Sequence, residues 1–309
     1  MGREEDILKS LELKSGEYFP PDGSKSARFI VQDDFNNKLF EFLVGRFGIE
    51  NKKHFREKFD QAISGDGDEA KKMISVRSSS LCALLCFYNV EKKPITFEIE
   101  NGQKIGFNKS FFEVKNKVYN NPSNMDVVLI SENNEYILFI ESKFAEYLEN
   151  GAVEISRTYR DEEPSKAIYD KAVGKVFYEK TANKYKVKDE YQYMGGLKQI
   201  ISHYVGLQNY KNRQDGYMSS YYTDKDSRLD VYKPAKRKIL FTEIVFKLAG
   251  FEGAYNKYNS GSNELFKLLR EADHDVEYLN PTDYWTLFTS EDNKNCLNKE
   301  IKKYYKLNK

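Results

Sequence analysis

The segment NPSNMDVVLISENNEYILFIESKF, residues 121–144, decides the fold of this chain because it holds two β-rich runs around a polar turn. The runs are DVVLI (126–130) and YILFIESK (136–143). A two-residue turn centred on Asn133-Asn134 is typical of a β-hairpin, since Asn tolerates the positive φ values that such turns require. The sequence therefore predicts an antiparallel hairpin here.

The predicted hairpin brings acidic and basic side chains together. Its turn places Asp126 directly opposite Glu141, at a Cβ separation of about 4.5–5.5 Å, so the two carboxylates can share one divalent cation. Lys143 follows Glu141 by two residues and points to the same face, whereas Ser142 points to the other face. Burying these charges beside apolar strands is costly unless a hard cation such as Mg²⁺ compensates them. The hairpin therefore predicts a metal site.

A site of this kind suits the hydrolysis of a phosphodiester. A metal neutralises charge on the phosphate and lowers the pKa of a bound water, while a nearby group orients that water. Lys143 is the candidate for the orienting group. A lysine close to a metal in a low dielectric is expected to have a lowered pKa, so water positioning and proton abstraction both stay open for it.

The hairpin resembles the signature of the PD-(D/E)XK, restriction-endonuclease-like nucleases, with Asp126 in the first half and Glu141-Ser142-Lys143 in the second. Met125 stands at the position of the proline that names the family. The resemblance implies an α/β/α core with a central mixed β-sheet, in which Asp126, Glu141 and the backbone carbonyl of Ser142 bind Mg²⁺, or Mn²⁺ in its place. It also implies that Lys143 lies beside the attacking water. The stretches ESKFAEYL and KQIISHYVGL are similar to a bacterial restriction-endonuclease-like branch, which implies DNA as the substrate.

Two further residues match positions of that family. Glu113, in FFEVKNKVY, resembles the acidic residue that many members add to the metal site from an upstream element. Its alternative is an exposed acid on a strand. Gln199, in LKQIISHY, resembles the glutamine that many members place beside the active site, and its alternative is a polar residue on an amphipathic helix. His203 is expected to hydrogen-bond within the fold rather than to bind a metal, because no second histidine stands near it in the sequence.

The charge balance excludes a general attraction to nucleic acid. Lys and Arg number 49 and Asp and Glu 48, so a nucleic-acid site must be a local patch. The segment 204–238 interleaves Tyr with Lys and Arg, as a surface that contacts phosphates and stacks bases would. Within it Lys236, Arg237 and Lys238 are the candidates, and the alternative is an exposed loop.

The cysteines and the hydropathy of the sequence predict the cellular compartment of the protein. The three cysteines are too few for a disulfide framework, and Cys82 and Cys86 lie in the apolar stretch LCALLCF, so we expect them in the core. The start of the chain is charged and no run of about 18 apolar residues follows, so a membrane span lacks support. We therefore expect a cytoplasmic protein.

Periodicity predicts one elaborated α/β domain in three parts. Residues 1–90 form an N-terminal helical extension, with helices in 34–63 and 70–90. Residues 91–250 form the nuclease core, with a solvated helical insertion near 144–193 and a buried strand in KILFTEIVFKL (238–248). Residues 251–309 form a C-terminal helical segment packed on the core.

The sequence thus predicts a Mg²⁺-dependent endonuclease of restriction type that hydrolyses phosphodiester bonds of DNA. A structure-specific or repair nuclease acting on DNA or RNA stays open, because the same carboxylates cleave any accessible phosphodiester. A non-catalytic nucleic-acid-binding module on the same fold is the other alternative. Cutting both strands of DNA requires two active sites, which makes a homodimer the hypothesis for assembly.

Overall fold

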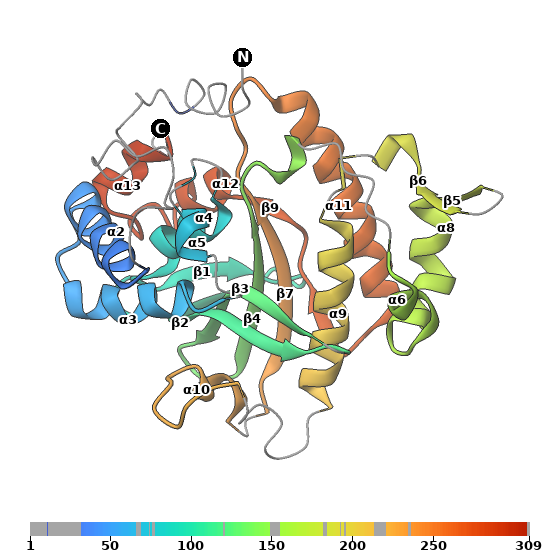
Figure 1. Cartoon of the computed structure of the whole chain (residues 1–309), viewed down its shortest axis with the longest axis horizontal. Helices are drawn as coiled ribbons and strands as arrows, with labels where there is room; N and C mark the ends of the chain where they lie inside the picture. The colour runs from blue at the N-terminus through green and yellow to red at the C-terminus, as the bar shows by residue number, and fades with distance from the viewer. Residues whose placement is uncertain are drawn as a thin grey trace.

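A computed structural model of the chain describes residue 11 and residues 32–65, 69–73, 75, 78–119, 121–148, 155–181, 184–191, 193–194, 196–212, 221–233 and 236–307. These residues form an α/β fold in which a mixed β-sheet lies between helices (Figure 1). The α/β class predicted from the sequence is confirmed. None of the helices described in these ranges is both long enough and apolar enough to cross a membrane.

The described residues build a seven-stranded sheet in which antiparallel and parallel strands meet at β4. The strands run in the order β1-β2-β3-β4-β7-β8, and β9 also pairs with β7. Strands β1 to β4 are antiparallel neighbours, whereas β7 is parallel to β4, β8 and β9. The bounds are β1 Ile95–Glu98, β2 Lys104–Lys117, β3 Pro122–Ser131, β4 Tyr136–Lys143, β7 Lys238–Val245, β8 Val276–Tyr278 and β9 Thr282–Asp283.

The β3–β4 hairpin has the register that the sequence predicts. Val127 and Ile140 are the last pair of the ladder, and continuing its register by one residue places Asp126 opposite Glu141. The turn differs from the prediction in one detail, because Asn134 has a positive φ of 60° and Asn133 does not. Asn133 instead accepts a hydrogen bond from the backbone N–H of Glu135 through its side-chain Oδ1, at 3.1 Å. Such a local side-chain bond stabilises a turn without a left-handed residue.

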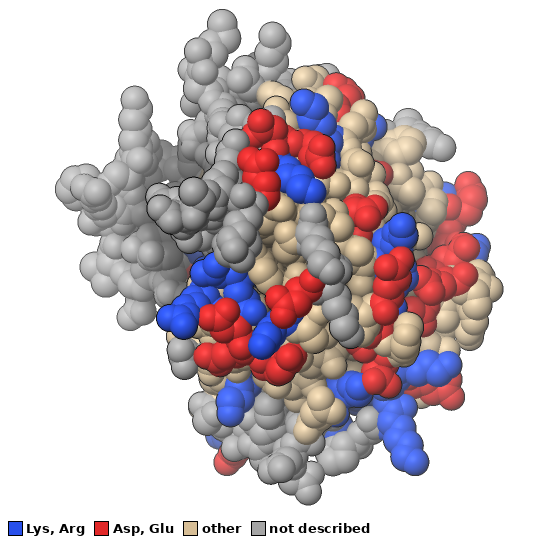
Figure 2. Space-filling model, turned by 90° about the vertical axis from the view of Figure 1, so that its right-hand side faces the viewer, with Lys and Arg blue, Asp and Glu red and all other residues tan. Residues whose placement is uncertain are grey.

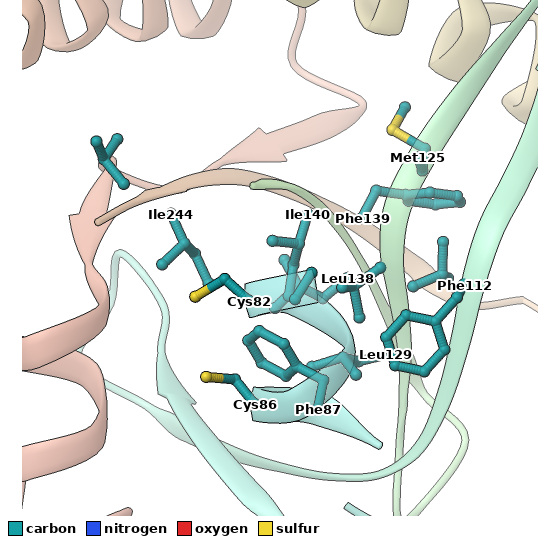
Figure 3. Close-up of a cluster of buried hydrophobic side chains, with 14 of the residues drawn as sticks. Cys82, Cys86, Phe87, Phe112, Met125, Leu129, Leu138, Phe139, Ile140 and Ile244 are labelled. Carbon is teal, nitrogen blue, oxygen red and sulfur yellow. The ribbon is translucent and has the colours of Figure 1, made fainter. Parts of the chain in front are cut away.

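Helices cover both faces of the sheet (Figure 1). Helices α9 (Leu197–Lys211) and α11 (Glu252–Ala272) lie on one face, where the ring of Phe139 packs edge-on to Tyr210, with centroids 5.0 Å apart. Helix α5 (Ser79–Phe87) covers the other face. Figure 3 shows Cys82, Cys86 and Phe87 of α5 beside Leu129, Leu138, Ile140 and Ile244 of the sheet. Both cysteines are buried in this core, as expected from the sequence.

The described residues between 32 and 90 are mainly helical, and residues 70–90 hold two helices rather than one; most of residues 1–31 of the predicted N-terminal extension lie outside the described residues. Helix α5 begins at an N-cap, where Ser78 Oγ accepts from the backbone N–H of Leu81 at 3.0 Å. A capping serine favours the start of a new helix at this point because its side chain satisfies N–H groups that otherwise have no partner. The remaining bounds are α2 Gln32–Phe47, α3 Lys52–Ala62 and α4 Glu69–Met73.

The described residues between β4 and α9 are only partly helical; helix α6 has no buried residue, but other parts of the segment bury aromatic side chains. Its described residues include a two-stranded antiparallel sheet that the sequence analysis did not predict. Tyr147, Tyr169, Phe177 and Tyr178 are buried in the common core. Aromatic rings supply here the apolar surface that a count of aliphatic residues misses. The elements are η2 Glu146–Leu148, α6 Arg157–Asp161, α7 Ser165–Ile168, η3 Tyr169–Val173, α8 Gly174–Val176, β5 Tyr178–Thr181, β6 Lys184–Val187 and η4 Asp189–Tyr191.

The C-terminal part adds strands as well as helices to the fold. Strands β8 and β9 extend the sheet beyond β7, and the sequence analysis did not predict them. They are three and two residues long, too short to show a periodic pattern. The remaining helices are α10 Leu229–Tyr232, α12 Tyr284–Thr289 and α13 Lys299–Tyr304.

Candidate functional site

Four acidic residues occupy one row across four neighbouring strands. Asp126 on β3 and Glu141 on β4 are opposite, as the hairpin register requires. Glu113 on β2 stands opposite Asp126, between the pairs that the flanking residues form across β2 and β3. Glu243 on β7 pairs directly with Glu141 in the parallel register. The sheet thus brings together Glu113, Asp126 and Glu141, which the sequence predicts, and adds Glu243.

Lys143 lies on the same face as Glu141, as predicted, and contacts it. Its Nζ donates to Glu141 Oε1 at 2.5 Å and to Gln199 Oε1 at 2.6 Å. Ser142 points the other way, where its Oγ donates to the carbonyl of Ser79 at 3.2 Å. Gln199 belongs to α9, so this helix delivers the predicted glutamine to the predicted lysine.

The second oxygen of Glu141 is held by a histidine that was not among the predicted site residues. His203 Nε2 lies 2.6 Å from Glu141 Oε2, and His203 Nδ1 lies 2.5 Å from Ser123 Oγ. A neutral imidazole that donates from Nε2 accepts the Ser123 hydroxyl at Nδ1. His203 hydrogen-bonds within the fold, as the sequence analysis expected, but its partner is the central carboxylate of the site. Its position four residues after Gln199, on the same helix face, is the signal that would have found it.

Asp126 reaches across to β4 from the neighbouring strand. Its Oδ2 accepts from the backbone N–H of Ser142 at 2.7 Å, which ties the aspartate to the residue after Glu141. Burial raises the pKa of Asp126 well above its usual value, and the nearby Glu141 and Glu113 carboxylates raise it further. The negative charge of the row is therefore not fully compensated by the basic groups of the protein.

Glu141 and Lys143 stabilise each other's charged forms. Burial by itself would raise the pKa of Glu141, but Lys143 and His203 outweigh it and lower that pKa to about 2. Burial would likewise lower the pKa of Lys143, but Glu141, Glu146 and further carboxylates raise it above its usual value. In the protein without a metal ion the pKa of Lys143 is raised rather than lowered, because several carboxylates surround the ammonium. In this arrangement Lys143 is a charged donor that bonds Glu141 and Gln199.

Glu113 is buried and has an unusual backbone conformation. Its φ is 49°, a left-handed value that a residue with a long side chain rarely adopts. Arg228 Nη1 donates to the carbonyls of Phe112 and Glu113, at 3.4 Å each, and so holds this point of β2. Arg228 comes from the segment 204–238 that was predicted to contact nucleic acid, but it is buried and serves the interior. The alternative of an exposed strand acid is excluded for Glu113.

The donor atoms fit a hard divalent cation. Among the described residues, no three His, Cys, Asp or Glu side chains are drawn together closely enough to count as a metal-ligand group. The chemistry of the row nevertheless suits one, since Glu113, Asp126 and Glu141 offer the carboxylate oxygens that Mg²⁺ and Mn²⁺ prefer. Each oxygen of Glu141 has a second lone pair beside its bond to Lys143 or His203. The Ser142 carbonyl, next in the chain, is the further oxygen that the sequence analysis named.

No family model matches the chain, and neither curated proteins nor solved structures give a significant match. The interpretation of the site therefore depends on its geometry alone.

The three basic residues predicted to bind nucleic acid are not brought to this site. Lys238 begins β7 and Val245, the partner of Lys143, ends it, so at about 3.3 Å per residue they are about 23 Å apart. Arg237 Nε donates to Asn134 Oδ1 at 2.9 Å, at the hairpin turn, and Lys238 Nζ lies over the ring of Tyr136. Lys236 is exposed beside them. The three basic residues therefore lie at the end of β7 that is far from Lys143.

Charge on the molecular surface shown in Figure 2 is mixed. Among its described residues, Lys and Arg alternate with Asp and Glu over the face turned toward the viewer. This pattern is typical of a solvated surface and gives no extended positive field for a polyanion. The face in Figure 2 therefore adds no candidate for phosphate binding.

Glu243 is the other site residue that the sequence analysis missed. It interrupts the apolar run KILFTEIVFKL, and both of its carboxylate oxygens are buried. A single acid in the middle of a buried strand is costly without partners, so this pattern itself was the signal. Burial raises its pKa, which Lys143 partly offsets.

Proposed function

We propose that this chain is a metal-dependent nuclease that hydrolyses phosphodiester bonds of DNA, with a core of the PD-(D/E)XK, restriction-endonuclease-like kind. The observation that carries the proposal is the row of Glu113, Asp126 and Glu141 with Lys143 on the same face, 2.5 Å from Glu141. The mixed sheet with helices on both faces supports the same core. An endonuclease of restriction type is the specific form that we propose.

The site residues have different roles in the proposed hydrolysis. Glu113, Asp126, Glu141 and the Ser142 carbonyl would hold Mg²⁺, which supplies charge neutralisation at the phosphate and acidifies a bound water. Lys143, kept charged by its carboxylates, orients the attacking water and adds positive charge where the phosphate gains negative charge. Gln199 fixes the Lys143 ammonium, and His203 fixes Glu141. Preorganisation of this kind lowers the barrier because no group has to rearrange during the reaction.

The substrate is tested by cleavage of several nucleic acids by the purified full chain. We expect nicking of supercoiled plasmid with Mg²⁺ or Mn²⁺ and none with EDTA. Cleavage of single-stranded DNA or RNA in preference to plasmid would instead favour a structure-specific or repair nuclease. Tight binding of DNA by a protein that never cleaves it, with either metal, would contradict the proposal and favour a binding module.

The close contact at Gly196 gives a further prediction. A Cβ added there would lie 3.1 Å from Lys143 Cε and 3.3 Å from Tyr258 Oη, so Gly196→Ala displaces the lysine. The backbone itself tolerates alanine, since Gly196 has φ −77° and ψ −4°. We expect a shift of a few tenths of an ångström to slow cleavage about tenfold, since a misplacement of about 1 Å can cost about a hundredfold. Single-turnover nicking measures this change.

Gly253→Ala is the matched control for that variant. A Cβ at Gly253, in the first turn of α11, meets nothing within 4 Å. Its cleavage rate should equal that of the unaltered chain. An unchanged rate for Gly196→Ala would show that the position of Lys143 does not limit the reaction.

A further inference from the structure

Glu243 is buried at the centre of the sheet, beside the proposed site. It lies on β7 and pairs with Glu141 across the parallel ladder, so the two carboxylates start from the same face. Both residues have no measurable exposure. A second acid next to Glu141 adds repulsion, and an apolar residue there would be the simpler way to fill the core. Its presence calls for a function beyond packing.

Helix α11 holds the Glu243 carboxylate by both oxygens. Tyr258 Oη donates to Oε1 at 2.5 Å, and Ser262 Oγ donates to Oε2 at 2.6 Å. The two donors are four residues apart, so they lie on one face of the helix, toward the sheet. Two directed bonds fix the orientation of the carboxylate and favour its ionised form against the effect of burial.

The Glu243 carboxylate interacts electrostatically with the ammonium group of Lys143. Lys143 stands two residues after Glu141, on the face that Glu141 and Glu243 share, and its charge interacts with both. Gly196 allows Lys143 and Tyr258, the partner of Glu243, to approach the same point. A side chain on its Cα would contact both of them. Glu243 on β7, Tyr258 on α11 and Gly196 at the N-terminus of α9 thus lie on the side of the sheet where Gln199 of α9 bonds the lysine.

We infer that Glu243 is a positioning residue for Lys143, fixed by Tyr258 and Ser262, and that it holds the ammonium in place for the reaction. The inference rests on the proposed function, since the positioning matters only if Lys143 takes part in phosphodiester hydrolysis. Glu243 acts through the lysine and has no contact of its own with the substrate. The negative charge of Glu243, and not the size of its side chain, positions Lys143.

Two measurements on the full-length chain test the inference, and the first does not depend on activity. Lys143→Met is made in the unaltered chain and in Glu243→Gln, and the melting temperature of each protein is measured. If the two residues interact, the loss caused by Lys143→Met is smaller by about 3 °C or more in the Glu243→Gln background, because no Glu243 charge is left uncompensated. Equal losses in the two backgrounds would overturn the inference.

The second measurement is single-turnover cleavage of plasmid. We expect Glu243→Gln to lower the maximal rate at least about tenfold with a change in KM below about threefold, since positioning acts on the chemical step. Ser262→Ala, which removes one of the two bonds, should show a smaller loss in the same direction. An unchanged rate in Glu243→Gln would also overturn the inference.

Asp273→Asn is the matched control for both measurements. Asp273 is likewise buried, lies at the end of α11 and accepts from Tyr278 Oη at 2.9 Å, but it has no contact with Lys143 among those described. Its variant should leave the cleavage rate and the effect of Lys143→Met unchanged. If the unaltered chain cleaves no substrate, the proposed function fails, while the melting temperatures still decide whether Glu243 and Lys143 interact.

Discussion

Asp126→Asn is expected to stabilise the metal-free protein at neutral pH and to abolish cleavage. Burial and the Glu141 and Glu113 carboxylates raise the pKa of Asp126, so its ionised form is disfavoured in the folded state. Asparagine removes the charge and keeps an oxygen that accepts from Ser142 N–H. We therefore expect a rise of a few degrees in melting temperature.

The pH dependence of that gain has a definite sign. An acid whose pKa is raised on folding binds its proton more tightly in the folded state, so it lowers stability as pH rises through the folded pKa. The advantage of Asp126→Asn should therefore be largest at pH 7–8 and should vanish below about pH 4, where the carboxyl is protonated in both states. Thermal unfolding in EDTA over this range measures it.

The same variant should lose both metal binding and activity. The unaltered chain is expected to melt at a higher temperature in Mg²⁺ than in EDTA, because a ligand that binds the folded state stabilises it. Asp126→Asn should show little of this shift and at least about a thousandfold slower nicking, since a ligand of the site is lost. A variant that is destabilised, or that retains the Mg²⁺ shift, would contradict the assignment of Asp126.

Glu141→Gln is expected to have the opposite effect on stability. Its carboxylate bonds the Lys143 ammonium at 2.5 Å and His203 at 2.6 Å, and both Glu141 and Lys143 are buried. Removing one partner of a buried ion pair costs about 3–5 kcal/mol, because the other charge is left without compensation. We thus expect Asp126→Asn and Glu141→Gln, two isosteric changes on adjacent strands, to change stability in opposite directions. Both should abolish cleavage.

The contribution of Glu141 should also appear in acid unfolding. Burial alone would raise its pKa, but Lys143 and His203 lower it to about 2, against about 4.5 for the free group. A lowered pKa contributes stability that is present above pH 4.5 and is lost as pH falls from 4.5 toward 2. The unaltered chain should lose stability relative to Glu141→Gln over this interval, as followed by melting temperature. Parallel curves for the two proteins would show that Glu141 is not held in its ionised form.

The sequence predicted the centre of the site because that part depends on local geometry. A hairpin register follows from its turn, and β-strand alternation then separates Lys143 from Ser142. Gln199 could be placed only by resemblance, since 56 residues separate it from Lys143. Glu243 was missed because its neighbour Glu141 is reached through a parallel pairing, which no turn signals in the sequence.

Three other expectations from the sequence differ from the structure or are not decided by it, each for its own physical reason. The helical insertion was expected to be solvated because aliphatic residues are few, whereas Tyr and Phe bury there instead. Nucleic-acid binding by Lys236, Arg237 and Lys238 stays a prediction, and their distance from the carboxylates could not be foreseen because composition does not indicate which end of a strand a residue occupies. The lowered pKa expected for Lys143 beside a metal stays a prediction, whereas without a metal the surrounding carboxylates raise it.

Nicking of supercoiled plasmid by Lys143→Met tests the proposed site most directly. The control is Lys104→Met, which removes an exposed lysine that bonds Asp292 at 2.6 Å, much as Lys143 bonds Glu141. We expect Mg²⁺-dependent nicking by the unaltered chain and by Lys104→Met, and a rate at least about a thousandfold lower for Lys143→Met at unchanged Mg²⁺ concentration. Nicking by Lys143→Met at the rate of the unaltered chain would contradict the site, and with it the nuclease that we propose.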